Sequence, residues 1–274
     1  MKLKDKIAIV TGGGRGIGRA ITLALAGNGA DVAVVARTSP EIDNVAAEIK
    51  VLGRRSMALK ADVADPKAVE SMVNSVIEEW GRLDILVNNA GVQGPIGTIV
   101  ENNTDEWIKT VHVNLFGTFL CTRAVLPGMI KQRKGKIINL SGGGATSARP
   151  NFTAYAVSKT GVVRFTETVA EELKQFNIQV NAIAPGAVIT NMTEEVLHAG
   201  KAAGEKAINE TRKQLETGGT PPEKAADLAI FLASDESDGL SGKLISAVWD
   251  EWQSFPEQMD EIMTSELYTL RRII

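Results

Sequence analysis

The sequence predicts an α/β fold, namely a doubly wound parallel sheet of about seven strands with helices on both faces. Short apolar runs, which suit fully buried strands, alternate along the chain with longer amphipathic stretches. A glycine-rich segment joins the first apolar run to the first amphipathic stretch. The length of 274 residues, with 44% hydrophobic and 23% charged residues, fits one large α/β domain. We therefore expect a single domain over residues 1–274, with a C-terminal extension at about residues 249–274.

The first half of the chain alternates expected strands with expected helices. Residues 41–52 carry apolar side chains at helical spacing, and Pro66 suits the first turn of a helix that runs to about Trp80. The strands expected in this half cover residues 7–10, 31–35, 56–59 and 83–87.

The second half continues the same alternation. A long helical region covers about residues 105–130, a second helix carries Tyr155, and Pro221 and Pro222 open a third. Residues 191–220 are polar, helix-prone and punctuated by glycine, which is typical of a lid over a site. The strands expected in this half cover residues 137–140, 178–183 and 243–248.

The segment TGGGRGIG, residues 11–18, directly follows the first expected strand. Glycines let the backbone approach a pyrophosphate closely, and the N-terminus of the next helix offers free N–H groups and a partial positive charge. The pattern T-G-x-x-x-G-x-G departs from the common G-x-G-x-x-G, because Ile17 is the sixth residue counted from Gly12. The alternative is a tight strand–helix turn without a ligand, which this density of glycine disfavours.

The end of the second expected strand favours NADP over NAD as the cofactor. An NAD site normally has an Asp or Glu near this point to bind the ribose 2′-hydroxyl, whereas this chain has Ala36-Arg37-Thr38. Arg37, together with Arg15 in the glycine segment, offers positive charge for a 2′-phosphate. Each arginine could equally be a solvated surface charge, so NAD is the alternative cofactor.

Further polar positions follow the next strands. Asp62 lies at a strand end, where it could meet the adenine ring or cap the helix that starts near Pro66. The segment NNAG, residues 88–91, ends the fourth strand, where side-chain amides can brace neighbouring strands and the cofactor ribose. Asn114 lies inside a helical region that asparagine fits poorly, so its amide could bond a backbone carbonyl or hold a water.

The segment KIINLSGGGATSARPNFTAYAVSK, residues 136–159, carries the strongest chemical signal. Tyr155 and Lys159 are four residues apart, so they lie on the same helix face, one turn apart. An ammonium beside a phenol favours the phenolate and lowers a pKa of about 10. Lys159 could therefore make Tyr155 a usable acid/base, and Ser141 could offer a hydroxyl to the same substrate oxygen. An isolated pair of this kind is usually solvated helix surface, so it gains weight only from the other signals.

Composition argues against several functional classes. A net charge of −3 and a pI of about 5.6 do not suggest binding to nucleic acid or to an anionic membrane. The N-terminus lacks the apolar region of a signal peptide and no apolar run approaches transmembrane length, so the expected location is the cytoplasm. Cys121 is the single cysteine, and His112 and His198 are far apart in sequence, so no metal site is expected.

Seven signals occur in a fixed order on alternating strands and helices: TGGGRGIG, Asp62, NNAG, Asn114, Ser141, Tyr155 with Lys159, and Pro185-Gly186 with Thr190. With these motifs the chain resembles the short-chain dehydrogenase/reductase superfamily, in its single-domain subgroup, over about residues 5–248. The resemblance implies a Rossmann-like fold and hydride transfer between NADP(H) and a carbonyl or secondary alcohol of a small molecule.

The resemblance also implies roles for the matching residues. Tyr155 is the acid/base, Lys159 lowers its pKa and holds the nicotinamide ribose, and Ser141 positions the carbonyl. Asn114 holds a water that relays protons through Lys159. The implied cofactor contacts are Thr11, Gly12, Gly14, Arg15, Gly16, Ile17, Gly18, Arg37, Asp62, Val63, Asn88, Ala90, Gly91, Tyr155, Lys159, Pro185, Gly186, Val188 and Thr190.

The chain departs from the family pattern around the serine. Ser141 lies 14 residues before Tyr155, one more than the usual spacing, and Gly142 occupies the usual serine position. Either the loop carries an extra residue and Ser141 still serves, which we favour because Ser141 ends the strand, or Thr146 or Ser147 takes part. The segment LISAVWDEW also replaces a V-D-G-G-like segment of many members, and the tail is longer than in many of them.

Two alternative functions follow from the resemblance. The 3-oxoacyl-[acyl-carrier-protein] reductases resemble this chain, and Arg133, Lys134 and Lys136 could form part of a basic surface for an acidic carrier protein. A non-catalytic dinucleotide-sensing module fits less well, because the tyrosine and the lysine are both present. Family members commonly assemble through two long helices, here at about residues 105–130 and 155–176, so we expect a homo-oligomer, with a tetramer favoured over a dimer.

Overall fold

A parallel sheet forms the centre of the protein in the computed structural model, which describes residues 1–272. Its strand order is β3-β2-β1-β4-β5-β6-β7, and every neighbouring pair is parallel. The strands are β1 (Ile7–Thr11), β2 (Asp31–Ala36), β3 (Ser56–Lys60), β4 (Ile85–Asn88), β5 (Gly135–Leu140), β6 (Ile178–Ala184) and β7 (Leu244–Ser246). The predicted doubly wound sheet is confirmed, and the expected strand ends differ from these by at most two residues.

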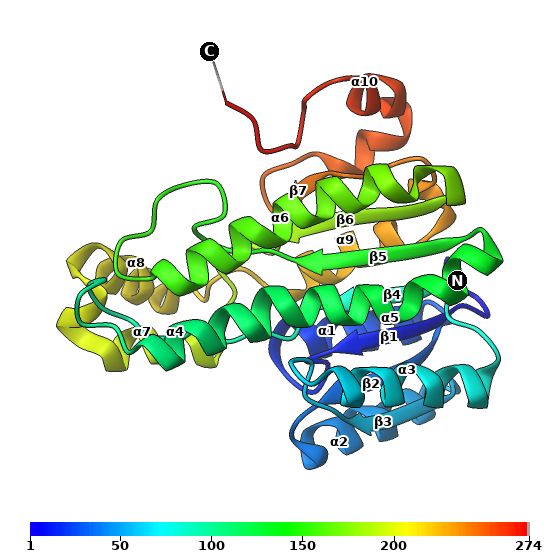
Figure 1. Ribbon diagram of the computed structural model, residues 1–274, viewed down its shortest axis with the longest axis horizontal. Helices are drawn as coiled ribbons and strands as arrows, with labels where there is room; N and C mark the ends of the chain where they lie inside the picture. The colour runs from blue at the N-terminus through cyan, green and yellow to red at the C-terminus, as the bar shows by residue number, and fades with distance from the viewer. Residues whose placement is uncertain (273–274) are drawn as a thin grey trace.

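Helices cover both faces of this sheet (Figure 1). One layer contains α1 (Gly16–Gly27), α2 (Ser39–Val51) and α9 (Pro222–Ala233), and the other contains α3 (Pro66–Trp80), α5 (Gly117–Gln132) and α6 (Thr153–Leu173). In β1, Ala8 and Val10 belong to the core under the first layer, whereas Ile7 and Ile9 belong to the core under the second. Because successive strand side chains point to opposite faces, a strand covered on both sides is apolar throughout.

The long helical region is interrupted at its centre. It consists of α4 (Thr104–Val111), a π-helical turn η1 (His112–Phe116) and α5, which follow one another without a break. Together these cover Thr104–Gln132, which is long and apolar enough to cross a membrane by length and composition. This corrects the expectation that no apolar run approaches transmembrane length. The apolarity has a packing cause, because Val113, Leu120, Val125 and Met129 belong to the core beneath the sheet.

The C-terminal segment folds back onto the edge of the sheet. It contains the turn η5 (Trp252–Glu257) and the helix α10 (Met259–Thr264), and Phe255 and Ile262 are buried in the core under α1 and α9. The backbone N–H of Leu244 in β7 donates to the carbonyl of Tyr268 at 2.8 Å. The tail therefore satisfies a backbone group on the outermost strand, which is a common way of protecting a sheet edge. Trp249, by contrast, is 84% exposed.

The strand order places a crevice at the carboxyl ends of the central strands. The chain runs outward from β1 to β3 and then crosses to β4 on the other side of β1. Loops after β1 and β4 therefore diverge, which creates the position where ligands bind in open α/β sheets. The helices α7 (Asn191–Ala199) and α8 (Glu205–Glu216) lie beyond these strand ends (Figure 1), so the segment expected to form a lid is helical and lies at this end of the sheet.

Candidate active site

A cavity of about 1200 Å³ lies at the carboxyl ends of the strands, between the glycine segment and the helices α7 and α8. Most of the predicted site residues line it: Gly12, Gly14, Arg15, Gly16, Ile17, Gly18, Arg37, Asp62, Val63, Ala90, Gly91, Ser141, Tyr155, Lys159, Pro185, Gly186, Val188 and Thr190. Three predicted residues, Thr11, Asn88 and Asn114, do not line it and instead support residues that do.

The glycine segment forms a cradle in which side chains have no room. A β-carbon on Gly12 would lie 2.8 Å from the Nδ2 atom of Asn89, and one on Gly18 would overlap the Gly12 carbonyl. Gly12 also has a φ of +63°, which glycine tolerates best. Asn89 Nδ2 donates to the carbonyls of Thr11 and Gly12 at 3.0 Å each, which holds the loop in place. The close backbone at the N-terminus of α1 fits a dinucleotide pyrophosphate. Asn89 was not predicted, although the NNAG motif contains it.

Thr11 and Asn88 act as braces behind the cradle. Thr11 Oγ1 accepts from the backbone N–H groups of Asn89 and Ala90 at 3.1 Å each. Asn88 Nδ2 donates to Thr122 Oγ1 at 3.1 Å and to Asn139 Oδ1 at 2.9 Å, which ties β4 to α5 and β5. The bracing expected of Asn88 is thus observed, and its side chain is buried.

At the other end of the cradle, charges of both signs line the cavity. Arg15 and Arg37 lie there as expected, and Arg15 Nη1 is 3.6 Å from a carboxylate oxygen of Glu41 in the first turn of α2. Glu41 was missed because the acidic residue was sought only at the end of β2. Asp62 Oδ1 accepts from the N–H of Ala64, and it does not cap α3.

The α3 cap is a different aspartate. Asp65 is the N-cap residue of α3 and accepts from the N–H of Lys67 at 2.9 Å. The capping alternative for Asp62 is therefore wrong, while Asp62 does line the cavity where an adenine could lie.

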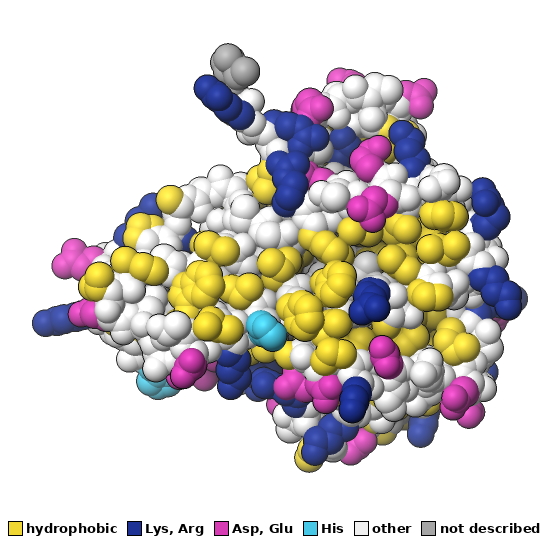
Figure 2. Space-filling view, viewed as in Figure 1, with side chains coloured by type: hydrophobic (Ala, Val, Ile, Leu, Met, Phe, Trp, Pro, Cys, Tyr) yellow, Lys and Arg dark blue, Asp and Glu magenta, His cyan; other side chains and the backbone are white. Residues whose placement is uncertain are grey.

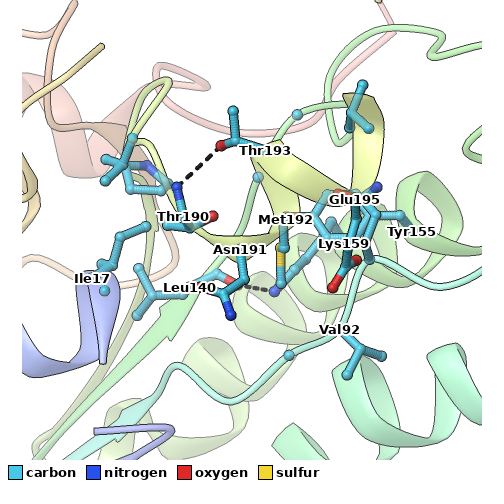
Figure 3. Close-up of a pocket in the computed structure, with 18 of the residues that line it drawn as sticks. Ile17, Val92, Leu140, Tyr155, Lys159, Thr190, Asn191, Met192, Thr193 and Glu195 are labelled. Carbon is cyan, nitrogen blue, oxygen red and sulfur yellow. Dashed lines mark hydrogen bonds between the residues drawn. The ribbon is translucent and has the colours of Figure 1, made fainter. Parts of the chain in front are cut away.

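Tyr155 and Lys159 lie one turn apart in α6 and both face the cavity (Figure 3). Lys159 Nζ donates to the carbonyl of Leu140 at 2.7 Å, at the end of β5, and lies 5.8 Å from the centroid of the Tyr155 ring. The same face of the helix thus presents a phenol and an ammonium next to the glycine cradle, as the four-residue spacing predicts.

Burial shifts both groups toward their neutral forms. It lowers the pKa of Lys159 from 10.5 to about 8. It also raises the pKa of Tyr155 above its ordinary value, against an opposing effect of the positive charge of Arg149. The expected net lowering of the Tyr155 pKa is therefore not met, because desolvation of the phenol outweighs the effects of nearby positive charge.

Asn114 is completely buried in the π-helical turn. Its Oδ1 accepts from the N–H of Val92 at 2.8 Å, and its Nδ2 donates to the Val92 carbonyl and to Ser158 Oγ at 2.9 and 3.0 Å. Of the two alternatives for this amide, the structure shows the bond to a backbone carbonyl. Asn114 thereby fixes the segment after Gly91 against α6, and the π-turn explains why an asparagine is tolerated within the helix.

The hydroxyl of Tyr155 faces Gly142 rather than a serine. A β-carbon on Gly142 would lie 2.5 Å from the Tyr155 hydroxyl oxygen. Ser141 Oγ is buried and has no hydrogen-bond partner among the residues that the structure describes. Thr146 and Ser147, the alternative hydroxyls, are exposed and line the same cavity.

Two further polar side chains line the cavity and have no assigned role among the predicted site residues. Gln93 is 3% exposed, and Arg149 is half-buried with its guanidinium carbon 5.6 Å from the centroid of the Tyr155 ring. Gln93 belongs to no motif. Arg149 lies within the segment of residues 136–159, where the sequence does not give its orientation.

Comparisons with known proteins agree with this geometry. The family described as short chain dehydrogenase matches residues 6–201. The 3-oxoacyl-[acyl-carrier-protein] reductase FabG of Thermotoga maritima is 37% identical over 246 residues, which is 89% of this chain and 97% of that protein. The oxidoreductase UcpA of Escherichia coli K12 is 38% identical over 244 residues, which is 88% of this chain and 92% of that protein.

Solved structures of other dehydrogenases and reductases share the fold of this chain. An NAD⁺-bound xylitol dehydrogenase matches with a TM-score of 0.83 and 28% identity, over 90% of this chain and 98% of that one. Levodione reductase matches with a TM-score of 0.81 and 30% identity, over 92% of this chain and 98% of that one. The glycine cradle, the Tyr155–Lys159 pair and these matches together show that the chain belongs to the short-chain dehydrogenase/reductase family of NAD(P)-dependent oxidoreductases.

Proposed function

We propose that this protein transfers a hydride between NADP(H) and a carbonyl or secondary alcohol of a small molecule, with Tyr155 as the acid/base. The observation that supports this most is the position of Tyr155 and Lys159, which face one cavity whose other end is the glycine cradle. Asn89 and Thr11 keep that cradle rigid. Bound there, the nicotinamide supplies or accepts the hydride.

Tyr155 supplies the proton in the direction of carbonyl reduction. Because burial raises its pKa, Tyr155 is protonated at neutral pH and can donate its hydroxyl proton to the substrate oxygen as the carbonyl carbon is reduced. The resulting tyrosinate is stabilised by the ammonium of Lys159 on the next turn of α6. In the oxidative direction the same groups work in reverse, and Tyr155 must lose its proton first.

Within this proposal, NADP is preferred to NAD as the cofactor. Arg15 and Arg37 line the cavity at the position where a 2′-phosphate would lie, and Arg37 is exposed. Glu41 argues in the other direction. Its carboxylate pairs with Arg15 and could accept a hydrogen bond from a ribose hydroxyl, as in an NAD site. Two of the matching solved structures contain NAD.

Reduction of 3-oxoacyl groups on acyl carrier protein is the second candidate, because FabG proteins are among the similar relatives. The basic surface suggested for carrier docking does not support it. Lys136 is buried and paired with Asp238 at 2.7 Å, and Lys134 is paired with Asp235 at 2.9 Å. Both lie at the start of β5, whereas the cavity lies at the strand's other end.

We also propose a cytoplasmic homo-oligomer, with a tetramer favoured over a dimer. Hydrophobic side chains gather in a broad band over α5 and α6 (Figure 2), and Phe119 and Val157 are among the exposed ones. A band of this kind on two adjacent helices suits contact with a second copy of the chain.

A panel of carbonyl compounds tests the proposed function, with NADPH and NADH run in parallel and the nicotinamide absorbance as the readout. Oxidation of NADPH by at least one class of ketone or aldehyde supports the proposal. Faster turnover with NADH would reject the argument from Arg37. Tight dinucleotide binding without turnover of any compound, including a 3-oxoacyl carrier protein, would instead favour the sensing module.

A further inference from the structure

Arg149 presents a positive charge at the substrate end of the cavity. Its guanidinium carbon lies 4.0 Å from the ring centroid of Phe152 and 5.6 Å from that of Tyr155. Phe152 is fully buried, so the ring beneath the guanidinium is a fixed part of the cavity wall. Stacking on an aromatic face orients the guanidinium without using its five N–H donors.

These donors have no partner in the described part of the chain. The Arg149 side chain forms no hydrogen bond or ion pair there. Burial lowers the pKa of Arg149, against smaller opposing effects of Tyr155 and Glu210. Glu210 and Glu195 line the same cavity, but neither lies within ion-pair distance of Arg149, and Glu210 is exposed to solvent. Among residues 1–272, this partly desolvated cation beside the proposed proton donor has no counter-ion.

Gln93 adds a second donor without a partner. Its side chain is 3% exposed and lines the cavity, and its Nε2 has no hydrogen-bond partner among the described residues. Leaving a buried donor unpaired is unfavourable, so such groups in folded proteins call for an explanation. A ligand rich in oxygen acceptors would satisfy both Gln93 and Arg149.

We infer that the substrate is an oxo acid, whose carboxylate Arg149 binds while Tyr155 donates its proton to a carbonyl a few bonds away. A guanidinium matches a carboxylate geometrically, because two parallel N–H groups can donate to its two oxygens. Gln93 offers a further hydrogen bond to the substrate oxygens. The inference rests on the proposed carbonyl reduction and specifies its substrate class.

The structure also suggests a rival role for Arg149. It could pair with Glu210 of α8 and so fasten the lid helices over the cavity. In that case neutralising Glu210 would have the same effect as neutralising Arg149, whereas a carboxylate site requires only Arg149.

The test compares oxo acids with their methyl esters. The 2-oxo, 3-oxo and 4-oxo acids of four to six carbons and the matching esters are reduced with NADPH by the wild type, Arg149→Gln, Arg149→Lys and Glu210→Gln. We expect the wild type to favour at least one acid over its ester by about 10- to 100-fold in kcat/KM, as for a charge-assisted hydrogen-bonded pair. Arg149→Gln should lose this preference mainly through a higher KM for the acid. Arg149→Lys should keep part of it, because it keeps the charge but not the planar guanidinium, and Glu210→Gln should keep all of it.

The outcomes separate this inference from the proposed function. Equal reduction of acids and esters by the wild type, or an acid preference that survives in Arg149→Gln, overturns the oxo-acid substrate while carbonyl reduction stands. If Glu210→Gln also loses the preference for the acid over its ester, Arg149 is assigned to fastening the lid. That result overturns the oxo-acid substrate as well. If no compound is reduced, titration of the NADPH complex with the same acids decides: binding by the wild type but not by Arg149→Gln retains the carboxylate site, and the absence of binding rejects it.

Discussion

Tyr155 and Lys159 are buried next to each other in α6, and burial moves their pKa values in opposite directions. Both shifts favour the uncharged form, because each group loses hydration without gaining a close counter-charge. The phenol therefore keeps the proton that carbonyl reduction needs. The lysine titrates near pH 8, within the range where enzymes are assayed.

This titration predicts the pH dependence of the reaction. Lys159 is charged below about pH 8, and its ammonium stabilises the tyrosinate that forms when Tyr155 gives up its proton. The rate of carbonyl reduction should therefore fall as the pH rises through about 8. The measurement is kcat/KM for reduction between pH 6 and pH 10, with NADPH affinity checked at each pH. A rate that stays constant across this range would show that the charge of Lys159 is not required.

The same burial predicts that Lys159 lowers the stability of the fold. Its pKa of about 8 lies below the ordinary 10.5, so the folded state binds fewer protons than the unfolded state between these values. The stability lost by burying the charged lysine is greatest below about pH 8, and this loss disappears as the pH rises toward 10.5. Lys159→Met should abolish activity yet raise the free energy of unfolding by about 2 kcal/mol at pH 7, after allowing for the lost bond to Leu140.

Urea unfolding of the wild type and Lys159→Met at pH 7 and pH 9.5 measures this effect. The difference in unfolding free energy between Lys159→Met and the wild type should shrink by about half or more at pH 9.5. A variant that is less stable than the wild type at pH 7 would mean that the hydrogen bond outweighs the cost of burial.

The sequence predicts site residues well where they belong to a motif with fixed spacing. Tyr155 and Lys159 face the cavity because four residues make one helical turn, and the glycines follow β1 directly. Gln93 escapes prediction because it lies in an irregular loop, where no periodicity relates sequence position to direction. For Arg149, which also lies in a loop, the sequence leaves open whether its charge holds an anionic group or is solvated. The pKa of Tyr155 was predicted with the wrong sign because spacing reveals the neighbouring charge but not the degree of desolvation.

At the scale of an element, we propose that the glycine segment and α1 hold the cofactor, and two glycines of α1 provide a matched pair for testing this. A β-carbon on Gly18 would overlap the Gly12 carbonyl, whereas one on Gly27 meets nothing within 4 Å. Gly18→Ala should reduce NADPH affinity at least about tenfold and cost about 1–3 kcal/mol of stability, because overpacking displaces the loop. Gly27→Ala should leave affinity unchanged and add up to about 1 kcal/mol, because alanine favours helix.

Fluorescence titration with NADPH and thermal unfolding compare the two variants. Equal affinities for NADPH in Gly18→Ala and Gly27→Ala would show that the cradle does not contact the dinucleotide.

The type of each element, helix or strand, was predicted more reliably than its internal turns and its capping residues. A helix over about residues 105–130 was expected, but its π-turn was not. Asn114 in this turn bonds Val92, 22 residues away, and no local pattern announces such a pair. In the same way, the sequence could not choose between Asp62 and Asp65 as the N-cap of α3. Both are aspartates, which an N-cap prefers, and they lie only three residues apart.

For the whole molecule, the exposed hydrophobic band on α5 and α6 predicts self-association. Phe119 is an exposed residue of α5, and its ring lies 5.7 Å from that of Phe116 and 6.4 Å from that of Phe165. Light scattering after size exclusion should give a multiple of the 29.2 kDa chain mass for the wild type and a smaller species for Phe119→Glu. Val51→Glu is the control, because Val51 is exposed on α2, outside the band, and its replacement should leave the assembly intact. A monomeric wild type would contradict this assignment.

The sheet order follows from the sequence only through the family resemblance, since apolar runs locate strands but do not say which strands pair. The particular contacts of the tail could not be predicted either. Its contacts join Tyr268 to Leu244 and Leu270 to Glu167 of α6, and no local pattern announces such pairs.

The central claim is that Tyr155 transfers the proton beside a dinucleotide held by the glycine cradle. Steady-state reduction of the best ketone by Tyr155→Phe, with NADPH affinity measured on the same preparation, tests it most directly. We predict that kcat falls by about 10²- to 10⁴-fold, the usual contribution of a general acid, while NADPH affinity changes by less than about twofold. Turnover by Tyr155→Phe at the wild-type rate would contradict the claim.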